Sequence, residues 1–158
     1  MLRRATPAIL SLIIVLFVSS VSFAGGLSTH FVEITLNKLE PGKTYSVKEI
    51  SKSTLIINNT TKDKTVDIEI VPEKPVDYNL VPGYEPIPDL SWVKIGKGYF
   101  EHIGPGGSAE TDISIAIPAG KEYYGKKYQV YIYSHTTGQG TFRVGIMSRL
   151  LINTILKP

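Results

Sequence analysis

The residues that could carry acid–base chemistry are few and widely spaced. The chain has three histidines, His30, His102 and His135, and none stands two or four residues from another, as paired metal ligands on one strand or helix would. Glu101, His102 and Asp112 could form an acid–base set if the fold gathered them. Polar residues that alternate with apolar ones along a strand instead face solvent, and we expect that of these three. The sequence therefore predicts no catalytic and no metal-binding residue.

The glycine-rich segment Gly104–Ser108 is the other pattern that could bind a ligand. It precedes the alternating segment Ile113–Ile117, whereas a phosphate-binding loop leads into a helix N-terminus. No nucleophile-elbow pattern occurs. The absence of cysteine excludes disulfides, a thiolate nucleophile, thiolate zinc sites and lipid attachment through cysteine. We expect these glycines to form a turn, and we expect no cofactor and no enzymatic activity.

Tyrosine is the most suggestive residue type. Nine tyrosines outnumber five phenylalanines and one tryptophan. Tyr78 and Tyr84 fall in a proline-rich segment, and Tyr123 and Tyr124 fall between two predicted strands. Exposed tyrosines offer contact area to carbohydrate or protein at little entropic cost, so these four are candidate ligand-contact residues. The alternative is that tyrosine is simply a preferred strand residue.

β-Strands have to position these side chains, because apolar and polar residues alternate along most of the chain. The alternation predicts strands at Phe31–Leu39, Thr44–Ile50, Ser53–Asn59, Thr65–Val71, Ser91–Ile95, Gly98–Ile103, Ile113–Ile117, Tyr128–Tyr133 and Thr141–Leu156. No helical pattern follows residue 24. Seven to nine short strands separated by turn residues predict an all-β chain, in which residues 25–158 form a single antiparallel β-sandwich.

The predicted strands also imply particular connections. The stretch Gly104–Ser134 contains two alternating runs around a short loop and predicts the core hairpin of the sandwich. Ser91–Ile95 and Gly98–Ile103 predict either a second hairpin or two separate short strands. The segment Pro72–Asp89 contains five prolines, which disfavour a central strand and predict a long loop. Trp92 and Tyr128 are predicted to lie in the core.

Two overlapping sequons for N-glycosylation begin at Asn58 and Asn59. In a hairpin turn both would be exposed, and they would be glycosylated only in a host that modifies secreted proteins. Asparagine is also a common turn residue, which explains the pair equally well.

The first 24 residues have the pattern of a secretory signal peptide. Arg3 and Arg4 precede the apolar segment Ala8–Val18, and Ser22-Phe23-Ala24 supplies small residues at a cleavage site. The alternative is an uncleaved membrane anchor, but a span needs about 20 apolar residues and this segment is shorter. Export to a periplasm or cell surface is therefore expected, with membrane attachment only if the signal is retained.

Removal of the signal peptide also changes the charge of the chain. The full sequence has 17 basic and 14 acidic residues, and the loss of Arg3 and Arg4 leaves a net charge of +1. Nucleic-acid binding needs a clustered basic face, so neither this charge nor an exported location favours a nucleic-acid partner.

Four segments carry a resemblance to a known group of domains. They are STLIINNTTKDKTVDIEIVP, SWVKI, GPGGSAETDISIAIPAG and GKKYQVYIYS, and they fall within Phe31–Leu156. Their layout resembles immunoglobulin-like surface domains akin to the peptidoglycan-binding region of WxL-type proteins, to the first domain of pilus chaperones and to major-sperm-protein-like domains. The resemblance implies an immunoglobulin-like β-sandwich. Pilus chaperones have two such domains with a basic cleft between them, and WxL-type proteins have a second region, so no functional residue is carried over from either.

Three functions are compatible with these observations. The first is an exported structural or protein-interaction module that acts through sheet edges and loops. Its partner would be an envelope or surface protein, or a second copy that receives Gly25–Leu39 as a donated strand. The second is a polysaccharide-binding module that uses the four candidate tyrosines. The third, an enzyme, needs Glu101, His102 and Asp112 to converge.

Overall fold

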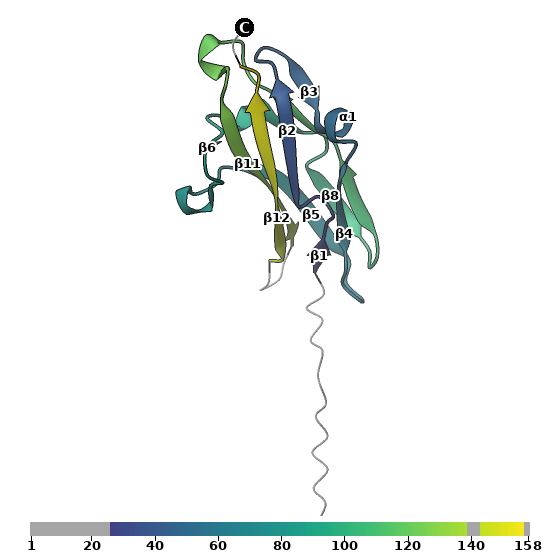
Figure 1. The fold of residues 1–158 in the computed structure, drawn as a ribbon. Coiled ribbons are helices and arrows are strands. Elements are labelled where there is room, and N and C mark those ends of the chain that lie inside the picture. Colours follow the sequence, from purple (N-terminus) through teal and green to yellow (C-terminus); the bar gives the residue numbers. More distant parts are fainter. Residues whose placement is uncertain (1–25, 139–142, 157–158) are drawn as a thin grey trace, which may run out of the picture.

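Alternating apolar side chains put two β-layers face to face in the computed structural model, which describes residues 26–138 and 143–156 (Figure 1). The larger sheet has the strand order β2-β12-β11-β5-β8, with β6 beside β11. Its strands are β2 (Glu33–Leu39), β5 (Val66–Glu73), β6 (Glu85–Pro86), β8 (Tyr99–Ile103), β11 (Lys127–Thr137) and β12 (Gly145–Thr154).

Two three-stranded sheets, β1-β4-β9 and β3-β10-β7, make up the facing layer. Only Asp112 separates β9 from β10, so the two sheets are continuous along that strand. Their strands are β1 (Leu27–Ser28), β3 (Thr44–Ser46), β4 (Leu55–Asn59), β7 (Val93–Ile95), β9 (Ser108–Thr111) and β10 (Ile113–Ala116). Figure 1 shows β1 at one end of the sandwich and the C-terminus at the other.

The core between the layers contains the residues that the alternation places inward. One apolar cluster joins Ile68 and Ile132 of the larger sheet to Ile57 and Ile115 of the facing layer. Tyr128 and Trp92 are buried, as predicted, and their rings pack edge-to-face with centroids 5.8 Å apart. The predicted β-sandwich is therefore confirmed.

The strand directions and count differ from the prediction. β2 pairs with β12, and β6 with β11, in parallel; the other strand pairs are antiparallel. The described residues contain twelve strand segments, because Asp112 divides one long strand and two segments are only two residues long.

The predicted strand Thr44–Ile50 is wrong in its second half. Strand β3 ends at Ser46, and α1 (Val47–Ser51) follows. The hydroxyl of Ser46 accepts a hydrogen bond from the amide of Glu49 and caps the helix, and Lys52 ends it in the left-handed conformation (φ 58°). Ser-x-x-Glu is the sequence signature of a capping box, which overrides the apolar alternation here. The chain is therefore mostly β rather than all-β.

The predicted core hairpin is also wrong, and of the two alternatives for Ser91–Ile95 and Gly98–Ile103 the structure shows two separate short strands rather than a hairpin. β10 pairs with β3 and β7, whereas β11 pairs with β12, β5 and β6, so the stretch Gly104–Ser134 crosses from one layer to the other. Likewise β7 belongs to the facing layer and β8 to the larger sheet. Alternation shows which face of a strand is buried but does not identify its partner.

The proline-rich segment Pro72–Asp89 is mostly irregular, as predicted, although β5 runs into it and β6 lies within it. It contacts the outer face of the larger sheet. There the side-chain oxygen of Gln129 accepts a hydrogen bond from the amide of Val81 (2.8 Å), and its Nε2 donates to the carbonyl of Asn79 (2.9 Å). Gln129 is fully buried as a result.

The structure corrects the expected exposure of the sequons. Asn59 is 1% exposed, and its Nδ2 donates to the carbonyls of Lys64 (2.8 Å) and Ile103 (2.9 Å). The side-chain nitrogen of Asn59 is therefore buried and hydrogen-bonded, so it is not accessible for glycosylation in the folded protein. Asn58 is half-buried and pairs with Ser28 of β1.

The predicted signal peptide, Met1–Ala24, lies outside the described residues. Within the part of the chain that is described, no helix has the length and hydropathy needed to cross a membrane.

Candidate binding sites

Glu101, His102 and Asp112 are all exposed, as expected for polar residues that alternate with apolar ones along strands. Asp112 forms an ion pair with Lys48 at 4.0 Å. His102 has φ 57°, and its amide donates to the carboxylate of Asp67 at 2.8 Å. The imidazole of His135 on β11 contacts the carboxylate of Glu69, its paired residue on β5, at 3.4 Å. Across residues 26–138 and 143–156, no three His, Asp or Glu side chains are grouped so as to hold a metal ion.

The four candidate tyrosines have different surroundings. Tyr123 is half-buried, and its ring packs edge-to-face on Trp92 with centroids 5.1 Å apart. Tyr78 is 87% exposed in a short 3₁₀ turn. Tyr84 lines a pocket that also includes Gly125, the residue after the half-buried Tyr124. The proline-rich segment and the β10–β11 connection therefore meet at Tyr84.

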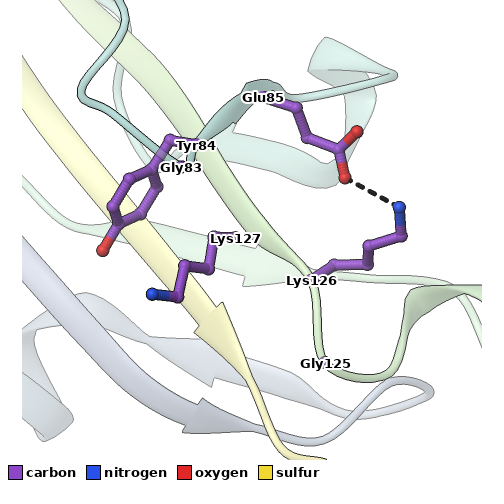
Figure 2. A pocket seen from close by; sticks show the side chains of 6 residues that line it. All are labelled: Gly83, Tyr84, Glu85, Gly125, Lys126 and Lys127. Atoms are coloured by element: carbon purple, nitrogen blue, oxygen red, sulfur yellow. Dashed lines mark ion pairs between the residues drawn. The ribbon is translucent and has the colours of Figure 1, made fainter.

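We name this open pocket of about 420 Å³ the pole pocket. It is lined by Gly83, Tyr84, Glu85, Gly125, Lys126 and Lys127. Figure 2 shows the Tyr84 ring beside Lys127, and the ion pair between Lys126 and Glu85 across from them. Nζ of Lys127 lies 5.8 Å from the centroid of the Tyr84 ring, and Nζ of Lys126 lies 3.1 Å from Oε1 of Glu85. The pocket thus combines an aromatic face, two ammonium groups and one carboxylate.

Local backbone structure holds the walls of the pole pocket. Pro82 and Gly83 (φ 84°) occupy the central positions of a turn in which the amide of Tyr84 donates to the carbonyl of Val81 (3.0 Å). Proline followed by a glycine of positive φ is the signature of a type II turn. On the opposite wall, the amide of Lys126 donates to the hydroxyl of Thr154 at 2.8 Å. Backbone hydrogen bonds therefore fix the chain at both Tyr84 and Lys126.

A second concave surface runs along the side of the sandwich. We name it the lateral groove; its volume is about 510 Å³, and it is lined by His30, Phe31, Lys52, Ser53, Thr54, Ile56 and Asn58. One wall is the chain that passes from β1 to β2, and the other is β4 with the residues that follow α1.

The lateral groove lies against an unpaired edge of β4. On one side, β9 pairs with Leu55–Asn58; on the other, β1 pairs only with Asn58 and Asn59. The amide of Asn59 donates toward β9, to Gly107, whereas the amide of Thr60 donates toward β1, to Gly26. Because alternate residues of a strand direct their backbone groups to opposite neighbours, Ile56 and Thr54 direct theirs into the groove. Among the described residues no strand pairs with them on that side.

Exposed apolar side chains occur in the groove and next to its residues in the sequence. Ile56, in the groove, is 39% exposed. Val32, which follows the groove residue Phe31, is 64% exposed, and Ile50, at the end of α1, is 39% exposed. Ile56 therefore adds an exposed apolar side chain to the unpaired edge.

The sequence prediction missed the groove, although one signal of it was present. Leu55, Ile56 and Ile57 are consecutive apolar residues in a strand with one buried face, so the middle one must face outward.

The β8 edge of the larger sheet is less suited to strand addition. β8 is five residues long, and its register against β5 shifts between Val66 and Ile68. The positive φ of His102 and the contact of its amide with Asp67 occur at this irregularity. Bulges and charged residues protect sheet edges from pairing with another chain.

Comparisons with known proteins identify the fold. No protein-family model matches the sequence, and the search of curated proteins gives no match. Among solved structures, the ASH/PapD-like domain 7 of human CEP192 has a TM-score of 0.58 and 13% identity over 85% of this chain and 88% of that one. A candidate carbohydrate-binding protein of Bacteroides ovatus has a TM-score of 0.56 and 12% identity over 84% and 38%. The periplasmic chaperone SfaE has a TM-score of 0.52 and 12% identity over 84% and 61%.

These similarities confirm the predicted resemblance at the level of fold: the chain is a PapD-like, immunoglobulin-like β-sandwich. It spans most of the CEP192 domain but less than two thirds of the other two proteins. Because proteins of different location and activity share the fold, function has to be argued from the surfaces of this chain.

Proposed function

We propose that this protein is an exported, non-enzymatic interaction module of the cell envelope, which binds an extended segment of a partner protein at the lateral groove. The unpaired edge formed by Thr54 and Ile56 is the observation that carries this proposal. A strand placed there would continue the position of β1 and add hydrogen bonds to β4. The exposed side chain of Ile56 would supply an apolar contact to alternate side chains of the added strand.

The variant Ile56→Pro tests the proposal with little disturbance of the fold. Proline removes the amide that faces the groove, whereas the neighbouring Leu55 and Ile57 carry the backbone groups that face β9. The matched control, Ile56→Val, keeps that amide and a β-branched side chain. We expect a phage-displayed library of random dodecapeptides to yield extended ligands that bind the wild type and Ile56→Val but lose at least tenfold in affinity for Ile56→Pro. Ligands that bind all three proteins equally would contradict strand addition.

The predicted donation of Gly25–Leu39 to a second copy has a competitor within the chain. β1 pairs with β4 and β2 pairs with β12 of the same molecule. Strand exchange would have to break these pairings first, so an outside peptide at the free part of the β4 edge is the better occupant.

We propose carbohydrate binding at the pole pocket as a second activity. Tyr84 supports it, because its ring borders an open pocket with polar groups on both sides. The pocket rather than the full set of four tyrosines would be the site, since Tyr123 is engaged with Trp92. Retardation in gels that contain polysaccharide tests it: Tyr84→Ala should abolish the retardation and Tyr78→Ala should leave it unchanged. The site is wrong if both variants behave as the wild type.

A further inference from the structure

We infer that the ligand of the pole pocket is an acidic sugar, a hexuronate unit whose carboxylate binds Lys127 and whose apolar ring face packs on Tyr84. This inference rests on the proposed carbohydrate binding and adds the chemical class of the sugar. Three features of the pocket lead to it: its charge, its geometry and the position of Glu85.

The pole pocket has one uncompensated positive charge. Lys126 is paired with Glu85 at 3.1 Å. Lys127 has no carboxylate within 4.0 Å among the described residues, and its recorded neighbour is the Tyr84 ring at 5.8 Å. Because Lys127 is exposed, its ammonium group is accessible to an anion that enters the pocket beside the Tyr84 ring. A single negative charge on the ligand would complete the pocket.

The ring and the ammonium group are arranged to bind two parts of one small molecule. Tyr84 is fixed by its turn, and Lys127 begins β11, where it is paired with Asn153 of β12. A pyranose presents an apolar face of C–H groups that packs on an aromatic ring, while a carboxylate on the same ring projects from its rim. The ion pair of Lys126 and Glu85 offers both donors and an acceptor to the sugar hydroxyls.

Glu85 makes a free phosphate a poorer ligand than a uronate. A free phosphate carries more negative charge at pH 7 than a single carboxylate does, so Glu85 within the same small pocket would repel it more strongly. Phosphate also lacks the apolar surface that would use the Tyr84 ring. Glu85 therefore favours a monoanion with hydroxyl groups over a compact dianion.

Isothermal titration of the purified protein with four probes tests the inference. The probes are tetragalacturonate, its methyl ester, the neutral sugar cellotetraose and inorganic phosphate. We expect tetragalacturonate to bind at least tenfold more tightly than the methyl ester and cellotetraose, and phosphate not to compete. Lys127→Ala should remove that preference for the acid, and Tyr84→Ala should weaken binding of tetragalacturonate at least tenfold. Tyr84→Phe should retain it.

Matched controls separate this site from general charge and from misfolding. Lys94→Ala removes an exposed lysine on β7, and Tyr78→Ala an exposed tyrosine, and neither lines the pocket; both should bind as the wild type. Equal binding of the acid and its ester, with loss in Tyr84→Ala, would overturn the inference and leave carbohydrate binding standing. No binding of any glycan would overturn both. Full competition by phosphate would show a general anion site and overturn the uronate assignment.

Discussion

Asn59 joins three parts of the chain through one buried side chain. Its Nδ2 donates to Lys64 and Ile103, and its Oδ1 accepts from the amide (3.0 Å) and hydroxyl (2.7 Å) of Thr61. All four hydrogen-bonding positions of the amide are therefore used. We expect Asn59→Ala to lower the free energy of unfolding by about 2–4 kcal/mol, because several partners become unsatisfied.

Urea denaturation measures the effect of Asn59→Ala. The neighbouring Asn58→Ala is the control: Asn58 is half-buried, and no side-chain hydrogen bond is recorded for it among the described residues, so a change below about 1 kcal/mol is expected. Equal destabilisation by the two substitutions would show that strand position, rather than the amide network, sets the stability.

Tyr128 gives the fold a specific sensitivity to alkali. Burial, with a smaller contribution from the charge of Glu85, raises the pKa of Tyr128 to about 12. Below about pH 10 the hydroxyl is neutral in both the folded and the unfolded chain, so it does not change stability with pH. As pH rises from about 10 to about 12 the hydroxyl ionises in the unfolded chain before it does in the folded one, and the free energy of unfolding decreases. The difference between a pKa of 10 in the unfolded chain and about 12 in the folded one corresponds to a loss of about 2–3 kcal/mol in the free energy of unfolding.

The comparison of wild type with Tyr128→Phe isolates this effect from other groups that titrate in the same range. The variant should match the wild type in stability near pH 8 and exceed it by about 2 kcal/mol at pH 12. Urea midpoints at intervals from pH 8 to 12 provide the measurement. A constant difference across that range would mean that the hydroxyl does not titrate differently in the folded state.

At the scale of elements, Gln129 holds the proline-rich segment on the sheet. Its side chain forms hydrogen bonds with the backbone of both Asn79 and Val81. In addition, the amide of Ile87 donates to the backbone carbonyl of Gln129 (3.0 Å). We expect Gln129→Ala to release the segment around Asp77–Asn79 and lower the free energy of unfolding by about 1–3 kcal/mol. Hydrogen exchange should become faster at Val81, whose amide loses its acceptor.

Tyr131→Phe is the matched control for the proline-rich segment. It removes one longer contact to the same Asn79 carbonyl (3.3 Å) and leaves Gln129 in place. Exchange at Val81 should stay slow in that variant. If exchange is equally fast in both, the segment is held by its prolines and apolar contacts rather than by Gln129.

The elements also show how far alternation predicts this fold. It identified the inward side chains of β5, β10 and β11, because a strand with one buried face leaves a period of two in the sequence. It did not predict that β10 and β11 lie in different layers, since the same period suits either partner. The capping residues Ser46 and Glu49 contained the signal for α1, but a helix of five residues is too short to leave a helical period.

The candidate sites were harder to predict than the core. Tyr84 was identified from residue type and its proline-rich surroundings, but its neighbours Lys126 and Lys127 come from a segment about 40 residues further along. The lateral groove depends on where β1 stops pairing with β4, and that boundary is set by the crossing of the chain from one layer to the other. Neither property is local in sequence.

At the scale of the whole molecule, the two proposed sites lie on different parts of the sandwich. The lateral groove borders the first strands, β1 and β4. The pole pocket lies near the end of β12, where the amide of Gly125 donates to the carbonyl of Ile155. Figure 1 places β1 and the C-terminus at opposite ends. The two proposed sites therefore do not overlap, which would allow one molecule to contact a protein and a polysaccharide at the same time.

The proposed export requires that removal of the signal peptide leave the sandwich intact. The amide of Gly26 donates to the hydroxyl of Thr60, and its carbonyl accepts from the amide of Thr60. Cleavage after Ala24 would leave both contacts in place, so we expect a secreted protein whose N-terminal residue is Gly25, as measured by mass spectrometry of the exported fraction.

Ala24→Leu puts a large residue at the cleavage position and should yield the uncleaved, membrane-retained form. Arg3→Glu with Arg4→Glu should reduce export, because the positive n-region is lost. A wild-type protein recovered with Met1 or Leu2 at its N-terminus would refute the cleavage, and one found only in the cytoplasm would refute the envelope function with it.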